Sequence, residues 1–428
     1  MSKPRHDWVG GNRLELLENG EAYYPRVLEE IARAQKEIFV ETFILFDDKV
    51  GKPFQQALIA AAQRGLRVEL TVDGYGSANL TPEFIAEMTD VGIGFHVYRP
   101  QPKIMGVRTN LFRRLHRKLV VIDGRLAFVG GINISHDHIA DYGEGSKQDY
   151  AVEVEGPVVR DIHRFCELSV AKHAMKTQTR QRWWQRKRAA PPAPHLQPVG
   201  SARAMFVVRD NERHHDDIER QYRHAIKAAR QRIVIANAYF FPGFRLLRNL
   251  RDAARRGVDV TLILQGKPDM WYVKWVAENL YEYLMKAGVT IYEYCERPLH
   301  AKVAVIDDRW ATVGSSNLDP LSLYLNLESN LVFDDAAFNQ HLASRLQNLM
   351  HNSCRKVEWT AIPKRDIRRQ LFNFVTYHLG RRFPAWVGWR PAHAAGLGQT
   401  KPDTRAVGDQ RQNPGGMESA EPGTSGRL

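Results

Sequence analysis

Residues 116–135 read HRKLVVIDGRLAFVGGINIS, and residues 300–319 follow the same plan as HAKVAVIDDRWATVGSSNLD. Each stretch opens on His-x-Lys, runs through four apolar residues to an Asp, and closes on Gly-Gly or Gly-Ser with an Asn two residues on. One His-x-Lys-x4-Asp match is expected by chance about once in twenty chains of this composition. Two matches with the same continuation are no accident, and they indicate a duplicated functional unit.

The duplication extends well beyond these stretches. Residues 27–46 and 218–241 both combine a helical pattern with a short apolar run. Residues 57–77 and 250–269 are both Ala-rich, reach Arg-Gly, and continue into a strand-like segment. A glycine stop after helical spacing, followed by Val, Ile and Leu, is typical of a helix that leads into a strand. The repeated alternation predicts an α/β fold with a mostly parallel or mixed sheet in each half.

Shifts in composition predict the domain boundaries. Residues 189–202, AAPPAPHLQPVGSA, form a Pro-rich linker between an N-terminal domain, 11–188, and a C-terminal domain, 203–360. Residues 361–397 interleave Arg with Phe, Tyr and Trp, which is typical of contact with a membrane surface, although a helix packed on the second domain would also fit. Residues 398–428 are rich in Gly, Pro and Thr and are expected to be disordered.

Charge and cysteine content narrow the class of protein. The chain of 428 residues has a net charge of +13, concentrated in residues 103–118, 172–188 and 361–397. Such basic runs on an otherwise acidic body favour an anionic partner, although each run alone could be a solvated face. Three scattered cysteines argue against a disulfide scaffold or a zinc site. We see no secretory signal and no spanning stretch, so we expect a soluble or peripheral protein.

The spacing of the repeated motif has a chemical meaning. Side chains two apart on a strand share a face, so His116 and Lys118 point together, as do His300 and Lys302. If the halves meet about a pseudo-twofold axis, one pocket holds both pairs, and the two imidazoles lie on opposite sides of a phosphodiester phosphorus. One imidazole would attack phosphorus to form a phosphohistidine, while the other would act as acid and then base. The lysines supply the positive charge that a metal would otherwise bring.

The other motif positions have supporting roles. The side-chain amides of Asn133 and Asn317 are candidate substrate donors, and the glycines before them allow close approach to a ligand. Asp123 and Asp307 complete the two motifs and belong to the candidate catalytic set, although their place at strand ends suits holding a turn. No cluster has metal-ligand spacing, so no metal or other cofactor is predicted. The histidines at 136–138 and 214–215 lie in polar sequence and are expected at the surface.

A nucleophilic imidazole needs an oriented acceptor for its second nitrogen. Asp149 and Glu328 open apolar alternating strands at equivalent places in the repeat, and we assign them as histidine-orienting residues. An ordinary carboxylate at a strand end is the alternative for each. The sequence does not tell which acid serves which histidine.

These residues carry a resemblance. The two His-x-Lys-x4-Asp motifs with their GG/GS-x-N continuations resemble the phospholipase D superfamily. Stretches such as RTNLFRRLHRKLVVID and ATVGSSNLDPLSLYLNLE are similar to bacterial cardiolipin synthases of the B type, over roughly residues 11–397. The resemblance implies two phospholipase D-like α/β/α sandwich domains related by a pseudo-twofold axis, with one active site at their interface, so that a single chain suffices.

The resemblance also implies an activity. It implies phosphatidyl transfer between two phosphatidylglycerol molecules, giving cardiolipin and glycerol, with His116 as nucleophile and His300 as acid and base. It further implies an anionic phospholipid membrane as partner and a peripheral location on the cytoplasmic face of the bacterial inner membrane. No nucleic-acid partner is expected.

Several alternatives stay open. The donor could be phosphatidylethanolamine, and free glycerol could be the acceptor, which would make the enzyme a phosphatidylglycerol-forming transphosphatidylase. A phospholipase D-type hydrolase would use water instead. A nuclease of the same superfamily would keep the chemistry and suit the positive charge. A non-catalytic binding module is disfavoured because both motifs are intact.

Overall fold

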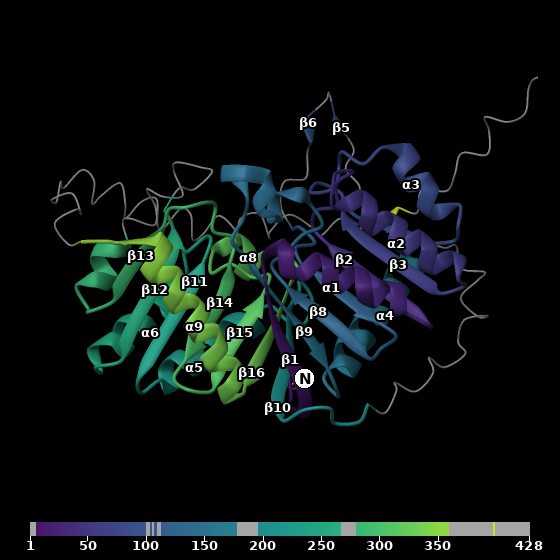
Figure 1. Ribbon diagram of the computed structural model, residues 1–428. Helices are drawn as coiled ribbons and strands as arrows, with labels where there is room; N and C mark the ends of the chain where they lie inside the picture. Colours follow the sequence, from purple (N-terminus) through teal and green to yellow (C-terminus); the bar gives the residue numbers. More distant parts are fainter. Residues whose placement is uncertain are drawn as a thin grey trace, which may run out of the picture.

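The computed structural model describes residues 6–99, 103–104, 107–108, 113–177, 196–266, 280–358 and 397–398 (Figure 1). The first half contains strands β1 (Val9–Glu18), β2 (Glu37–Thr42), β3 (Arg67–Asp73), β4 (Gly94–Tyr98), β7 (Leu119–Ile122), β8 (Leu126–Gly130) and β9 (Tyr150–Glu155), and the small hairpin of β5 (Lys103–Ile104) and β6 (Val107–Arg108). Its helices are α1 (Asn19–Arg33), α2 (Gly51–Gln63), α3 (Pro82–Thr89) and α4 (Val159–Thr177), with short turns η1 (His136–His138) and η2 (Ala140–Gly145).

The second half repeats this plan. Its strands are β10 (Ala202–Arg209), β11 (Arg232–Asn237), β12 (Asp259–Gln265), β13 (Thr290–Tyr294), β14 (Lys302–Ile306), β15 (Trp310–Gly314), β16 (Glu328–Asp334) and β17 (Cys354–Lys356), and β18 (Leu397–Gly398) pairs back with β4. Its helices are α5 (Asp217–Ala228), α6 (Phe244–Arg255), α8 (Pro320–Tyr324) and α9 (Ala336–Ser353). The α/β class and the duplication predicted from the sequence are confirmed.

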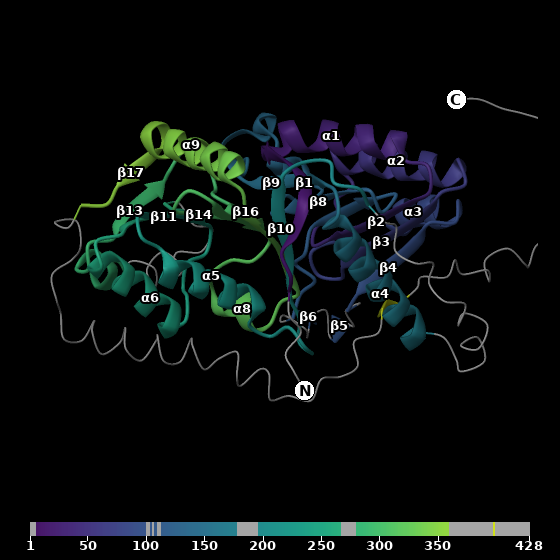
Figure 2. The ribbon, with the colours of Figure 1, turned by 90° about the horizontal axis from the view of Figure 1, so that it is seen from below.

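The sheet order shows the pseudo-twofold relation directly. Outward from the centre, the first half runs β1-β9-β8-β7-β2-β3-β4 and the second runs β10-β16-β15-β14-β11-β12-β13. The outer strands β2, β3 and β4 are parallel, as are β11, β12 and β13, whereas the inner strands are antiparallel. An antiparallel pairing between β1 and β10 joins the two halves into one sheet, and both strands lie in the middle of the molecule (Figures 1 and 2).

Three large apolar cores are formed by the described residues. A central core takes side chains from both halves and includes α4 and α9, and strands β8 and β9 of the first half lie against β15 and β16 of the second. Helices α1, α2 and α3 cover the other side of the first half. Helices α5 and α6 do the same for the second half. The shared core fixes the two halves against each other, which is a precondition for a site between them.

Hairpins bring the repeated motifs into place. The β7–β8 hairpin turns at Asp123 and Gly124, both with positive φ, and the β14–β15 hairpin turns at Asp307. Positive φ in a tight hairpin turn is typical of Asp and Gly. Each hairpin therefore starts at the His-x-Lys end and returns to the Gly-Gly or Gly-Ser end, so that the two ends of a motif meet at the same edge of the sheet.

Candidate active site

The two His-x-Lys segments lie at the contact between the halves. The backbone N–H of His116 donates to the carbonyl oxygen of Leu327 at 2.9 Å, and that of His300 donates to the carbonyl oxygen of Gln148 at 2.8 Å. Leu327 belongs to the second half and Gln148 to the first. Each His-x-Lys segment is therefore hydrogen-bonded to the backbone of the opposite half.

Each imidazole is also oriented by an acid of the opposite half. Nδ1 of His116 lies 3.0 Å from Oε2 of Glu328, and Nδ1 of His300 lies 2.5 Å from Oδ2 of Asp149. The two carboxylates are fully buried, whereas the His116 and His300 side chains remain 12% and 15% exposed. The structure brings the two orienters assigned from the sequence to the histidines, in a crossed arrangement. Holding Nδ1 in this way leaves Nε2 of each ring for the substrate.

The two motifs differ at Gly131 and Ser315, and the structure gives a reason. A Cβ atom on Gly131 would lie 2.3 Å from Oδ1 of Asp149, so only glycine fits there. The hydroxyl of Ser315 instead donates to Oε2 of Glu328 at 2.5 Å. The shorter acid packs directly against a glycine, and the longer acid is held by a serine. The two histidines consequently have carboxylate partners in different environments.

Those environments shift the carboxylate pKa values in opposite directions. Burial raises the pKa of Asp149 to about 7, although nearby Lys302 acts to lower it. Burial also acts to raise the pKa of Glu328, but the charges of His116 and Lys118 and the Ser315 hydroxyl lower it overall. Burial lowers the pKa of His116, and burial with Lys302 lowers that of His300 further. Near neutral pH, His116 is therefore an uncharged base beside a carboxylate, while the His300–Asp149 pair can hold one extra proton.

Lys118 and Lys302 are both buried, at 2% and 0% exposed, and lie close enough for the charge of Lys302 to act on Lys118. Nζ of Lys118 donates to the carbonyl oxygen of His116 at 2.8 Å, and Nζ of Lys302 donates to that of His300. Burial lowers the pKa of Lys118 to about 7 and that of Lys302 to about 8. Two confined ammonium groups favour an anion, and a phosphodiester has the charge and oxygens to satisfy both.

The asparagines lie beside the histidine segments. Oδ1 of Asn133 accepts from the backbone N–H of Ile44 at 3.3 Å, which leaves its amide hydrogens as the groups that a ligand could use. Asn317 is 4% exposed, and its Oδ1 has no hydrogen-bond partner among the described residues. In this half Oδ1 of Asn237 accepts from the backbone of Leu318. The side-chain oxygen of Asn133 is therefore hydrogen-bonded to the backbone, whereas that of Asn317 has no partner among the described residues.

Asp123 and Asp307, which the sequence groups with the catalytic residues, form hydrogen bonds to the backbone in the structure, and their catalytic role stays a prediction. The Asp123 carboxylate accepts from the backbone N–H groups of residues 35–37, and the Asp307 carboxylate accepts from those of residues 230–232. Each lies seven residues beyond its histidine, at about 3.3 Å per residue along extended chain. Both carboxylates hold the start of a neighbouring strand, β2 or β11, at the far end from the pocket.

The expectation that the histidines at 136–138 are surface residues is wrong for His138. It is completely buried, and its ring meets the His300 ring edge to face, with centroids 5.4 Å apart. His136 stays partly exposed and pairs with Asp141 at 2.6 Å. Nothing in this polar stretch distinguishes the buried histidine from the exposed one, so the sequence offered no signal.

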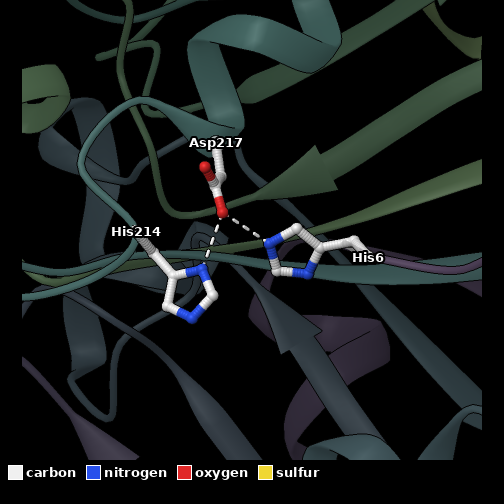
Figure 3. A group of neighbouring side chains, drawn as sticks. All are labelled: His6, His214 and Asp217. Carbon is white, nitrogen blue, oxygen red and sulfur yellow. Dashed lines mark hydrogen bonds and ion pairs between the residues drawn. The ribbon is translucent and has the colours of Figure 1, made fainter. Parts of the chain in front are cut away.

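The histidines at 214–215 also differ from the expectation. His215 is exposed, but Nδ1 of His214 and Nε2 of His6 both contact Oδ2 of Asp217, at 2.6 and 2.7 Å (Figure 3). Arg220 takes the other oxygen of Asp217 at 2.7 Å. This cluster, the His6–Asp217–His214 clasp, ties the segment before β1 to the start of α5.

Three groups of side chains among the described residues, contrary to the sequence reading, lie close enough to share a metal ion. They are the clasp, the pocket set His138, Asp149 and His300, and the set Glu37, His163 and Glu167. In the pocket, Lys118, Lys147 and Lys302 all act on His138 as nearby positive charges. With one carboxylate among three ammonium groups, this set favours an anion over a cation. In the clasp, the Asp217 carboxylate is already shared by two imidazoles and Arg220.

Two oriented imidazoles and two buried lysines around one pocket define the two-histidine phosphodiester-exchange enzymes, and the comparisons with known proteins agree. The family model described as "Cardiolipin synthase, PLD-like domain" matches residues 27–161 and 222–350. Cardiolipin synthase B of Salmonella typhi is 53% identical over 92% of this chain and 94% of its own length. The protein of that name from Escherichia coli K12 is 51% identical over the same shares. The chain therefore belongs to the phospholipase D-like cardiolipin synthase family.

Solved structures support the fold. A phosphatidylserine synthase from Haemophilus influenzae superposes with a TM-score of 0.63 at 15% identity, covering 88% of this chain and 94% of that one. A polyphosphate kinase from Porphyromonas gingivalis superposes with a TM-score of 0.56 at 14% identity, covering 87% and 53%. At these identities the likeness concerns the fold alone.

Proposed function

We propose that this chain forms cardiolipin and glycerol from two molecules of phosphatidylglycerol. The observation that carries the proposal is the crossed pairing of His116 with Glu328 and of His300 with Asp149 around two buried lysines. The relatives that match over nearly the whole chain bear the name of that reaction.

In the first step, Nε2 of His116 attacks the phosphorus of one phosphatidylglycerol. The P–O bond to the headgroup glycerol breaks, and the leaving oxygen takes a proton from Nε2 of His300. The products are a phosphatidyl-histidine on His116 and free glycerol. Glu328 stabilises the charge that develops on the His116 ring, and the two lysines stabilise the phosphoryl oxygens.

In the second step, His300 acts as the base. A hydroxyl of the second phosphatidylglycerol gives its proton to Nε2 of His300, and its oxygen attacks phosphorus. The P–N bond to His116 breaks, which restores the neutral imidazole and releases cardiolipin. The proton that His300 lent in the first step returns in the second, so the cycle balances. The extra proton that the His300–Asp149 pair can hold suits His300 to the acid role. The lowered pKa of Glu328 suits His116 to the nucleophilic role, because an ionised carboxylate stabilises the charge that develops on the ring.

We also propose that the protein works at the surface of an anionic bilayer, on the cytoplasmic face of the inner membrane. None of the helices in the described ranges is both long and apolar enough to cross a membrane. The basic-aromatic segment at residues 361–397 stays the predicted contact, and apart from Leu397 it lies outside the described residues. The domain boundaries and the tail at 398–428 stay predictions in the same way.

The test is turnover of labelled phosphatidylglycerol vesicles by the purified chain with EDTA present. Cardiolipin and glycerol should form with the unaltered chain and with His351→Ala, an exposed control on α9, but not with His116→Ala or His300→Ala. Formation of phosphatidic acid in place of cardiolipin would show that the enzyme is a hydrolase and not a transferase. Loss of turnover with EDTA would contradict the metal-free mechanism. Cleavage of nucleic acid without lipid turnover would refute the lipid substrate.

A further inference from the structure

His138 puts a third imidazole into the pocket, and it has no counterpart in the second half. Aligned from Gly130-Gly131 and Gly314-Ser315, the position of His138 corresponds to Ser322. The His138 ring stands edge to face against His300 at 5.4 Å, with an interplanar angle of 77°. One side of the pocket thus carries a polar ring that the pseudo-twofold relation does not require.

The ring beside the other histidine is apolar. Phe43 lies against His116 with centroids 5.1 Å apart, and the residue that corresponds to Phe43 in the second half is Ala238. The first half therefore supplies a ring to each catalytic histidine, and the two equivalent positions of the second half carry small side chains. An apolar ring suits the histidine that bonds to phosphorus, since it brings no group that competes for Nε2. A polar ring suits the histidine that handles an exchanging alcohol.

Hydrogen bonding identifies which atom of His138 can act. Its Nε2 accepts from the backbone N–H of Asn133 at 3.3 Å, so the neutral ring carries its proton on Nδ1. Nδ1 has no hydrogen-bond partner within the part of the chain that the structure describes, although the side chain is completely buried. A buried donor without a partner is unfavourable, which points to a ligand atom as its partner in the working enzyme.

The position of the ring directs this donor to the His300 side. A ring nitrogen of His138, a ring nitrogen of His300 and a carboxylate oxygen of Asp149 all lie within 4.8 Å of one another. Burial and the charge of Lys147 lower the pKa of His138 well below the usual histidine value, so it stays neutral. A neutral ring donates from Nδ1 without taking a proton from the reaction.

We infer that His138 is an alcohol-binding residue, whose Nδ1–H donates a hydrogen bond to the alcohol oxygen that is exchanged on the His300 side. This role rests on the proposed two-step transfer. In the first step the bond stabilises negative charge on the departing glycerol oxygen. In the second step the acceptor hydroxyl gives its proton to His300, attacks phosphorus through one lone pair, and accepts from His138 with another. The acceptor oxygen is thereby fixed at two points before it attacks.

Two amide substitutions separate this role from a structural one. In His138→Gln the amide oxygen reaches the place of Nε2, so the bond from Asn133 is kept and the Nδ1 donor is lost. In His138→Asn the amide reaches the place of Nδ1, so the donor is kept and the bond from Asn133 is lost. The assay is incorporation of labelled free glycerol into phosphatidylglycerol vesicles, with glycerol varied, beside a thermal melt.

The expected result is a split between the two variants. His138→Gln should melt like the unaltered chain but lose about tenfold in kcat/KM for glycerol, the usual size of one hydrogen bond. His138→Asn should melt lower but keep kcat/KM within about threefold. His351→Ala, exposed on α9, should leave the KM for glycerol unchanged. An unchanged kcat/KM in His138→Gln, or losses that only follow the melting temperature, would overturn the role. No turnover by the unaltered chain would instead overturn the proposed function and this role with it.

Discussion

The contact between Gly131 and Asp149 gives the sharpest test of the site. In Gly131→Ala the new Cβ would lie 2.3 Å and 2.6 Å from the two carboxylate oxygens of Asp149. Ordinary contact requires about 3.4 Å, so the carboxylate must move by about 1 Å. Oδ2 of Asp149 is hydrogen-bonded to Nδ1 of His300 at 2.5 Å, and a hydrogen bond lengthened by about 1 Å would no longer orient the ring. A displacement of this size at a reacting group costs about 100-fold in rate.

The matched substitution is Ser315→Ala, which puts the same residue at the equivalent position of the other motif. Its Cβ is already present, so no clash arises. The hydrogen bond from the Ser315 hydroxyl to Glu328 is lost, together with the one that this hydroxyl accepts from the backbone N–H of Ser329 at 3.0 Å. We expect a rate about tenfold lower, the usual size of one buried hydrogen bond.

The assay is initial-rate cardiolipin formation from labelled phosphatidylglycerol vesicles, with a thermal melt for each variant. Gly131→Ala should lose far more activity than Ser315→Ala while still melting cooperatively. Equal losses in the two variants, or full activity in Gly131→Ala, would show that the Asp149–His300 geometry does not control the reaction.

Three further predictions follow from the described contacts. The pKa values of Lys118 and Lys302 lie at about 7 and about 8, so binding of inorganic phosphate or tungstate should weaken as the pH rises from about 7 to about 9. Calorimetry in buffers of different ionisation enthalpy should show that binding takes up protons. An affinity that does not depend on pH would contradict this. Asp123→Asn should lower the free energy of unfolding by about 1–3 kcal/mol, measured in urea, yet keep kcat within a few-fold, and a loss of kcat at full stability would restore Asp123 to the catalytic set. Hydrogen bonding to Asp217 raises the pKa of His214. The stabilisation of the fold by this pair should therefore be complete below about pH 6.5 and disappear as the pH rises through the raised pKa. His214→Ala should lower the melting temperature more at pH 6 than at pH 9, and an equal effect at both pH values would refute an ionic clasp.

Local pattern was sufficient to predict part of this molecule. The α/β class, the duplication and the pocket of two histidines and two lysines follow from motif spacing and strand periodicity, because both are short-range properties of the chain. The orienting acids were also visible, since Asp149 and Glu328 occupy the same place in the two repeats. The pattern could not predict that each acid contacts the histidine of the opposite half. That pairing depends on contacts between residues that are separated by 151 positions in one pair and by 212 in the other.

Other features were missed for similar reasons. Strands β1 and β10 were not distinguished in the sequence, although their pairing joins the halves. His138 looked like a surface residue because its neighbours in sequence are polar, whereas in the fold it is buried and contacts His300 of the other half. Asp123 was grouped with the catalytic residues because it shares their motif, whereas its hydrogen bonds run to the backbone of residues 35–37.

The backbone bonds from His116 to Leu327 and from His300 to Gln148 also have a consequence for biosynthesis. A ribosome releases the first motif long before it makes Leu327 and Glu328. The early half can collapse around its own helices, but His116 then has neither its acid nor its backbone partner. Closing such distant contacts is a slow, late event in folding. Under the proposed mechanism, phosphatidyl transfer therefore does not begin on the nascent chain, and activity during refolding should rise only after the secondary structure of both halves has formed.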